Sequence, residues 1–294
     1  MAYESYRTGE YFQQQRHMLV NGDPRALICF CIDVSESMNE WWVERGGVRR
    51  TSGSSFSDGH KVQDFNPEDI LPGYDHYVKI DKLNEVLGSL LRELKYDRDI
   101  NKTVAVSIVV YSRFGRVIYN FLDCADLDIN SCRCKVEEPC TSMGEGLRVA
   151  LQQIDDMTEE LRYVDKDAYV PMLIFMTDGT PTDDPSREFA KVRRRVEEGS
   201  LHVFPLGIGE GADMTRLQDL FPMGKAPSNF RTRYKMVQPR DYEVIFKEIK
   251  NHIHRKHRLM VTEENSIQSA PATTAISVLN NQTGETLALA DLIL

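Results

Sequence analysis

The chain has 294 residues, of which 41% are hydrophobic and 28% charged, and its net charge at pH 7 is −9. These values are ordinary for a globular protein that buries a sizeable core, and the negative charge argues against nucleic acid as the main partner. No apolar run approaches the ~20 residues that cross a bilayer, so we expect no membrane span. Residues 1–16 lack the apolar segment of a secretory signal, which predicts a cytoplasmic protein.

Strand and helix patterns alternate along the chain from Ala26 to about Arg258. The runs Ala26–Ile32 and Val104–Val110 are almost continuously apolar, which is typical of strands buried on both faces of a mainly parallel sheet. Between them, Ile80 begins an apolar stripe at the spacing of a helix with one buried face. Strands are expected at 26–33, 103–111, 116–121, 169–177, 201–208 and 230–236, and helices at 79–95, 144–156, 186–198, 213–220 and 240–257. The alternation predicts a layered α/β domain.

The same patterns divide the chain into an N-terminal extension (1–25), a domain (26–258) and a C-terminal tail (259–294). Within the domain, residues 39–77 are too many for an ordinary connection of ~2–6 residues and are interpreted as an insertion. Two tryptophans at its root, Trp41 and Trp42, either anchor the insertion against the domain or contact a partner. The apolar end of the tail either docks on a partner or pairs back within the chain.

Polar side chains stand where two of the predicted strands end. Asp33, Ser35 and Ser37 follow the first strand, Asp178 follows the strand expected at 169–177, and Thr141 shortly precedes a helix. Alternate residues in extended backbone share a side, so the first three side chains can converge on one point. Open α/β sheets bind ligands beyond the carboxyl ends of their strands. Carboxylate and hydroxyl oxygens at such a point suit a hard divalent cation.

These motifs carry a family resemblance. Asp33-x-Ser35-x-Ser37, then Thr141 followed by Ser-Met-Gly, then Thr-Asp178-Gly resemble the metal-ion-dependent adhesion site of von Willebrand factor A domains. The resemblance spans most of residues 26–258 and implies a doubly wound, mainly parallel six-stranded sheet with helices on both faces. It also implies that these five residues hold a divalent cation. The phrase at 175–183 is similar to bacterial cytoplasmic A-domain proteins associated with tellurium resistance and phage defence.

The ligand types indicate what such a site does. A cation held mostly by neutral hydroxyls stays electron-poor, so it can accept a carboxylate from another protein. We therefore expect a metal-dependent protein–protein interaction module rather than an enzyme, using Mg²⁺ or Mn²⁺, within a bacterial stress or defence complex. One alternative is a metal-dependent phosphoesterase in which His60 or His76, both in the insertion, acts as the base. Another is a scaffold that binds partners through the insertion and the tail.

Four cysteines lie close together in the sequence: Cys124, Cys132, Cys134 and Cys140. Their spacing lacks the paired C-x2-C knuckles of a zinc site, so reduced thiols are favoured over structural zinc.

Three further patterns give local predictions. Asp183 and Asp184 directly precede the helix expected at 186, and are interpreted as its N-terminal cap and first-turn acid. Glu36, which stands where the family commonly has glycine, is expected to point outward. In the last helix the predicted buried stripe is Val244, Ile245, Phe246, Ile249 and Ile253. His252, His254 and His257 are interpreted as charges near the C-terminal end of that helix.

Overall fold

The computed structural model describes residues 26–44, 47, 67–163, 169–209, 211–215, 217, 234–236, 239–269, 277–279 and 286–288. The N-terminal extension, much of the insertion and most of the tail lie outside these ranges. The strand predicted at 230–236 and the helix predicted at 213–220 are therefore described only in part. Among the helices of the described residues, none combines the length and the apolar composition needed to cross a membrane.

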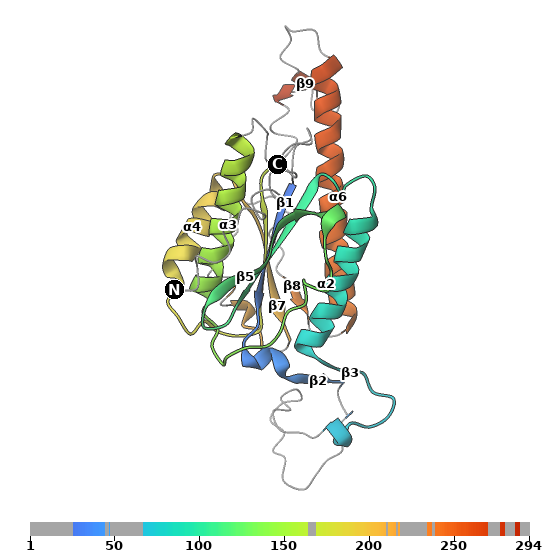
Figure 1. Ribbon diagram of the computed structural model, residues 1–294, viewed down its shortest axis with the longest axis vertical. Helices are drawn as coiled ribbons and strands as arrows, with labels where there is room; N and C mark the ends of the chain where they lie inside the picture. The colour runs from blue at the N-terminus through green and yellow to red at the C-terminus, as the bar shows by residue number, and fades with distance from the viewer. Residues whose placement is uncertain are drawn as a thin grey trace.

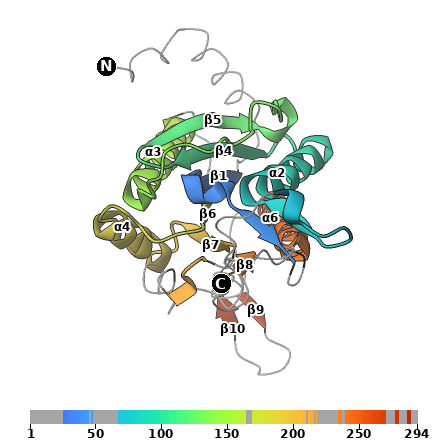
Figure 2. The same cartoon turned by 90° about the horizontal axis from the view of Figure 1, so that it is seen from below.

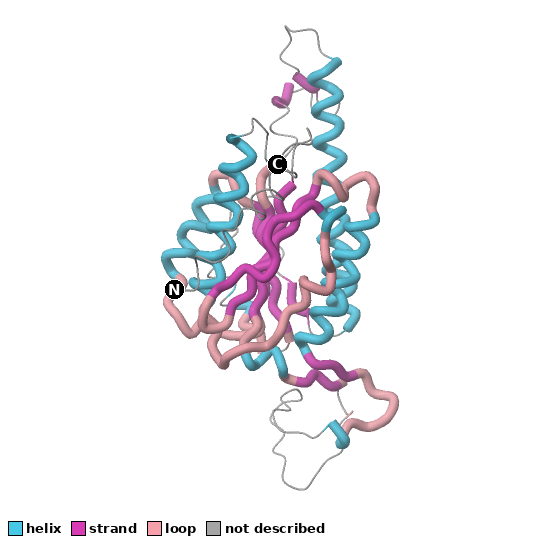
Figure 3. Tube along the Cα trace, viewed as in Figure 1, coloured by secondary structure: helices cyan, strands magenta, loops and turns pink. Residues whose placement is uncertain are grey.

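A six-stranded sheet runs through the centre of the molecule, with strands in the order β5-β4-β1-β6-β7-β8 (Figures 1 and 3). Only β4 and β5 pair antiparallel, and every other pair in this sheet is parallel. The bounds are β1 Ala26–Asp33, β4 Val104–Tyr111, β5 Gly115–Asp123, β6 Met172–Thr177, β7 His202–Ile208 and β8 Tyr234–Met236. The predicted mainly parallel, six-stranded sheet is confirmed, with each boundary within a few residues where the chain is described.

Helices cover both faces of the sheet, as expected. Helices α2 (Lys79–Tyr96) and α6 (Pro239–Ser269) contact each other on one face, and α3 (Met143–Tyr163) and α4 (Ser186–Glu197) contact each other on the opposite face (Figure 2). Strands β1, β4 and β6 are almost completely buried between them, which explains the continuous apolar runs of β1 and β4. The doubly wound fold class is confirmed.

Helix α6 corrects three details of the sequence analysis. It continues to Ser269, past the predicted end at 257, because no glycine or proline interrupts the sequence before Pro271. The three histidines therefore lie inside the helix and not at its end. Val244 is 52% exposed, whereas the other four predicted stripe residues are buried together with Tyr242. Val244 lies about 200° around the helix from Tyr242 and so faces away from the sheet.

The insertion begins and ends in a short antiparallel hairpin, β2 (Trp41–Val43) with β3 (His76–Val78). Trp42 stacks on Tyr77 with ring centroids 5.1 Å apart, and Tyr77 packs edge-on against Tyr242 of α6 at 5.7 Å. Trp42 thus anchors the root of the insertion against the domain, in agreement with the first of the two interpretations. The ring centroids of Trp41 and His76 lie 5.9 Å apart across the same hairpin.

The tail forms a second short hairpin, in which β9 (Ser277–Leu279) pairs antiparallel with β10 (Thr286–Ala288). Part of the apolar end of the tail therefore pairs back within the tail itself. Residues 289–294 lie outside the described part.

The sheet order brings the two carboxylate motifs together. Strand β1 lies between β4 and β6, and the chain moves outward from β1 to β4 and β5 before it crosses to β6 on the other side of β1. This is a topological switch point, where the loops after adjacent parallel strands leave in opposite directions and open a crevice. Asp33 ends β1, and Thr177 ends β6 directly before Asp178.

Candidate metal centre

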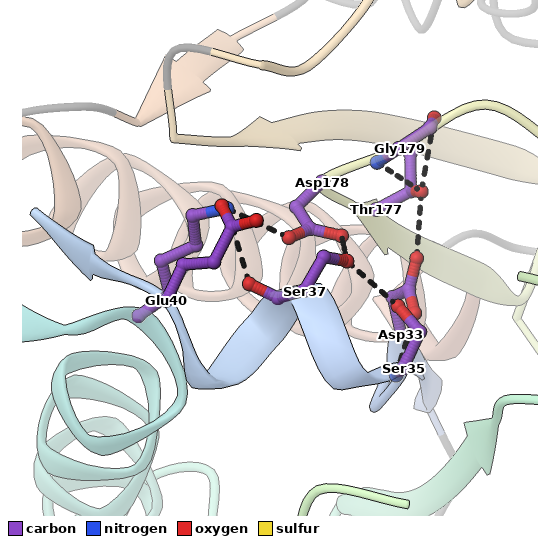
Figure 4. A network of polar contacts seen from close by, with 8 residues as sticks. Asp33, Ser35, Ser37, Glu40, Thr177, Asp178 and Gly179 are labelled. Carbon is purple, nitrogen blue, oxygen red and sulfur yellow. Dashed lines mark hydrogen bonds and ion pairs between the residues drawn. The ribbon is translucent and has the colours of Figure 1, made fainter. Parts of the chain in front are cut away.

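Four of the five predicted metal ligands form one hydrogen-bonded group at the carboxyl ends of β1 and β6 (Figure 4). Asp33 is the last residue of β1, and Ser35 precedes a short 3-10 helix, η1 (Glu36–Asn39), which carries Ser37. Asp178 comes from the loop after β6. Asp33, Ser35 and Asp178 are buried, and Ser37 is half-buried.

The oxygen atoms of this group are spaced as the ligands of one small cation are. Ser35 Oγ lies 3.0 Å from Ser37 Oγ, and Ser37 Oγ donates to Asp178 Oδ1 at 2.8 Å. Six oxygens arranged as an octahedron at Mg²⁺ distances have neighbouring oxygens about 2.9 Å apart. Within the described ranges no three His, Cys, Asp or Glu side chains are placed to hold a metal ion together, so a cation at this point depends on hydroxyl ligands. The donor set fits Mg²⁺ or Mn²⁺.

Asp33 is held in place by two donors. The backbone N–H of Ser35 donates to Oδ1 at 2.9 Å, and Thr177 Oγ1 donates to Oδ2 at 2.9 Å. Burial raises the pKa of Asp33 well above its ordinary value, and the nearby charge of Asp178 raises it further. Two buried carboxylates this close repel each other, so the group gains from any positive charge placed between them.

Thr141, the fifth predicted ligand, lies beside this group. Its backbone is fixed to the loop after β6 by two hydrogen bonds, because Thr141 N donates to Thr182 Oγ1 and Thr182 N donates to Thr141 O, both at 3.0 Å. A Cβ built on Gly179 would lie 3.6 Å from Thr141 Oγ1, which places this hydroxyl next to the residue that follows Asp178. Thr182 is thus a positioning residue that the sequence analysis did not identify.

Asp183 caps a different helix from the one predicted. Its Oδ2 accepts hydrogen bonds from the backbone N–H groups of Gly144 and Glu145, at the start of α3, at 2.9 and 3.3 Å. Asp184 lies two residues before the start of α4 and accepts hydrogen bonds from the N–H and the hydroxyl of Ser186, so it is not the first-turn acid that was predicted; the acid in the first turn is Glu188. The prediction for Asp183 was wrong because the loop after β6 folds over the start of α3, and the unpaired N–H groups there are the nearest donors.

Lys79 enters the group from the first residue of α2, and the sequence analysis did not identify it. Its Nζ donates to Asp178 Oδ2 at 2.9 Å, to Glu40 Oε2 at 2.8 Å and to the carbonyl of Ser37 at 3.2 Å. Burial alone would lower the pKa of Lys79, but Asp178 and Glu40 raise it above its ordinary value, so the side chain is charged. The signal in the sequence was a lysine four residues before Leu83, on the buried face of the helix.

The structure also shows where Glu36 and the candidate base His76 lie. Glu36 is exposed, as expected, although it begins a 3-10 helix and not an extended segment. His76 is exposed on β3, its ring lies against Trp41, and its Nδ1 is 3.0 Å from the carbonyl of Tyr74. The other candidate base, His60, lies outside the described residues.

The cysteines near Thr141 are free thiols. Cys124, Cys132 and Cys134 are buried and Cys140 is half-buried. Burial raises the pKa of Cys132 and of Cys134 to about 12, which keeps both protonated. Cys132 Sγ donates to the carbonyl of Asp128 at 3.3 Å, so this thiol has a local structural contact.

Comparisons with known proteins place this geometry in a wider context. The sequence matches the family model described as von Willebrand factor type A domain over residues 76–249. The match includes Thr141 and Asp178 but begins at the last two residues of the insertion, and therefore leaves out Asp33, Ser35 and Ser37. A search of curated proteins found no match.

Solved structures share the fold at low sequence identity. The PilB minor pilin of Streptococcus sanguinis has a TM-score of 0.51 at 14% identity, covering 86% of this chain and 64% of the pilin. The pilus adhesin SpaC of Lactobacillus rhamnosus GG has a TM-score of 0.51 at 12% identity, covering 79% of this chain and 31% of the adhesin. A mussel byssus protein, proximal thread matrix protein 1 with a zinc-occupied MIDAS motif, has a TM-score of 0.45 at 15% identity, covering 78% of this chain and 48% of the byssus protein. The chain spans between 46% and 64% of the first solved structures that it matches.

Proposed function

Since this chain belongs to the von Willebrand factor type A domain family, whose members generally mediate metal-dependent protein–protein interactions, we propose that it binds a carboxylate of a partner protein through a divalent cation. The observation that carries the proposal is the convergence of serine hydroxyls and buried carboxylates at the switch point of the sheet. Ser35, Ser37 and Asp178 have the oxygen spacing of one octahedral ion.

Each residue has a defined part in this proposal. Ser35, Ser37 and Thr141 offer neutral oxygens, while Asp33 and Asp178 orient the hydroxyls and balance the charge. A divalent cation bound there would supply an open coordination position for the partner's carboxylate. The net charge of −9 disfavours a broadly acidic partner surface, so we propose a single Asp or Glu within a mixed surface.

The finer assignments are proposals of the same kind. We propose Mg²⁺ or Mn²⁺ because the donors are hard oxygens. We propose a bacterial, cytoplasmic protein in a stress or defence complex, and the support for this is the similarity of the sequence phrase at 175–183 to bacterial cytoplasmic A-domain proteins. We propose no catalytic role. His76 has contacts with Trp41 and Tyr74, and no contact with the ligand group appears among the described residues.

The test is to capture partners from the lysate of the native host with wild-type protein and with Asp33→Ala and Thr141→Ala, each in Mg²⁺ or in EDTA. A matched control is Thr158→Ala, which removes a threonine hydroxyl bonded to Ile154 within α3, far along that helix from the centre. Isothermal titration of each protein with Mg²⁺ and Mn²⁺ measures the cation directly.

We expect one or more partners to be lost with EDTA and with both centre variants, and retained with Thr158→Ala. Partners that remain in every condition would assign binding to the insertion or the tail and reject the proposal. A wild-type protein that binds neither cation would reject it as well.

A further inference from the structure

We propose that Lys79 sets the charge of the metal centre. Compared with a centre without this lysine, the centre binds its cation less tightly but, once the cation is bound, holds a partner carboxylate more tightly. The inference rests on the proposed function and adds to it the residue that balances cation affinity against partner affinity. It concerns Lys79, Glu40 and Asp178, whose contacts are direct.

The position of Lys79 is built into the fold. Its side chain is 8% exposed, and its three donors are all used, on Asp178, Glu40 and the carbonyl of Ser37. With no donor left, Lys79 does not contact an external ligand while these bonds hold. Its stem passes so close to Gly209 that a Cβ there would lie 2.8 Å from Lys79 Cε. Gly209 has φ of 73°, a conformation that favours glycine, so the backbone leaves room for this lysine.

The charges around Lys79 explain its effect on cation and carboxylate binding. With the cation bound, Asp33 and Asp178 carry two negative charges in a buried place, and Lys79 cancels one of them. A divalent ion then leaves the loaded centre with one positive charge, whereas the same centre without Lys79 would be neutral. The charge of Glu40 counts for less, because that side chain is 38% exposed and water screens it. Lys79 therefore repels an entering cation and attracts an entering carboxylate.

A purely structural role predicts something different. If Lys79 merely held Asp178 in place, then removing either Lys79 or its other partner, Glu40, would loosen Asp178 and weaken cation binding. The charge model predicts opposite signs, because one substitution removes a positive charge and the other a negative charge.

The experiment compares the full chain with Lys79→Gln, Lys79→Arg and Glu40→Gln, using isothermal titration with Mg²⁺ and with Mn²⁺. The matched control is Lys82→Gln, since Lys82 is on the same helix but pairs with Glu85, away from the centre. Partner affinity is probed with acetate, whose displacement of Mn²⁺-bound water is followed by water-proton relaxation of the Mn²⁺-loaded protein.

We expect Lys79→Gln to bind the cation about tenfold more tightly and acetate several-fold more weakly, and Glu40→Gln to bind the cation a few-fold more weakly, with Lys82→Gln unchanged. Weaker cation binding by both Lys79→Gln and Glu40→Gln would overturn the proposal. Should Lys79→Gln fail to fold, Lys79→Arg decides: cation affinity within about threefold of wild type supports the charge model, and a loss beyond about tenfold overturns it.

Different results would disprove the proposed function and the role of Lys79. A wild-type protein that binds no divalent cation defeats the proposed function itself. A wild-type protein that binds the cation, while Lys79→Gln binds it no more tightly, defeats only the role of Lys79.

Discussion

Replacing Thr177 with valine tests whether the centre depends on how Asp33 is oriented. Valine has nearly the shape of threonine, so the change removes one hydroxyl and little else. That hydroxyl donates to Asp33 Oδ2 at 2.9 Å and accepts from Gly179 N at 3.2 Å. Thr177 is 1% exposed and Asp33 is fully buried, so water does not replace the lost donor to the carboxylate.

The expected losses of stability and of Mg²⁺ affinity follow from the type of hydrogen bond that is removed. A hydrogen bond to a charged group contributes about 1.5–3 kcal/mol to the free energy of unfolding. Groups that orient a metal ligand typically change metal affinity by about 10–100-fold when removed. We therefore expect Thr177→Val to lower stability in urea by about 2 kcal/mol and to weaken Mg²⁺ binding at least about tenfold.

The control is Thr103→Val, because Thr103 Oγ1 donates to the carbonyl of Ile100 at 3.1 Å in the turn before β4, at the opposite end of the strand from the centre. This change should lower stability by about 1 kcal/mol and leave Mg²⁺ affinity unchanged. Urea denaturation and isothermal titration measure the two quantities separately. Wild-type Mg²⁺ affinity in Thr177→Val would refute the idea that this hydroxyl positions Asp33.

Three further predictions concern packing, pH and thiol reactivity. Gly146→Ala in α3 should lower the free energy of unfolding by about 1–3 kcal/mol, because the new Cβ would meet the Tyr111 ring at 2.5 Å. Gly88→Ala in α2, where no atom lies closer than 3.9 Å, should instead raise it by about 0.5–1 kcal/mol in the same thermal or urea unfolding. Because the pKa of Asp33 is raised on folding, the folded metal-free protein binds more protons than the unfolded chain. Its stability should therefore fall from about pH 4 to about pH 7, and a rise over this range in EDTA would contradict the burial of Asp33. Among the six cysteines, Cys140 should react first with maleimide, since the other five are buried, and peptide mapping that finds Cys132 labelled equally fast would contradict the packing of that loop.

Much of the fold could be predicted from sequence because its signals are local. The uninterrupted apolar runs of β1 and β4 and the stripe of α2 each arise from a short stretch of chain, and their predicted ends differ from the structure by at most one residue. Three of the five ligand candidates have a local signal of this kind, since Asp33, Ser35 and Ser37 are spaced two residues apart at the end of a buried strand, whereas the resemblance to the family motif adds Thr141 and Asp178.

The errors fall where distant segments meet. Local sequence placed Asp183 at the start of α4, but the fold brings it to the open N–H groups of α3. A count of apolar residues placed Val244 in the buried stripe, but the sheet covers only one side of α6, and Val244 lies on the other.

The amino-acid sequence by itself determined the class of fold and pointed to the candidate oxygen donors, because periodicity and motif spacing act within a few residues. Tertiary structure alone decided the charge of that centre. Lys79 and Asp178 are 99 positions apart, and their ion pair exists because α2 packs beside the ends of β1 and β6. A pairing of this kind depends on where whole elements pack, and no local pattern around either residue records it.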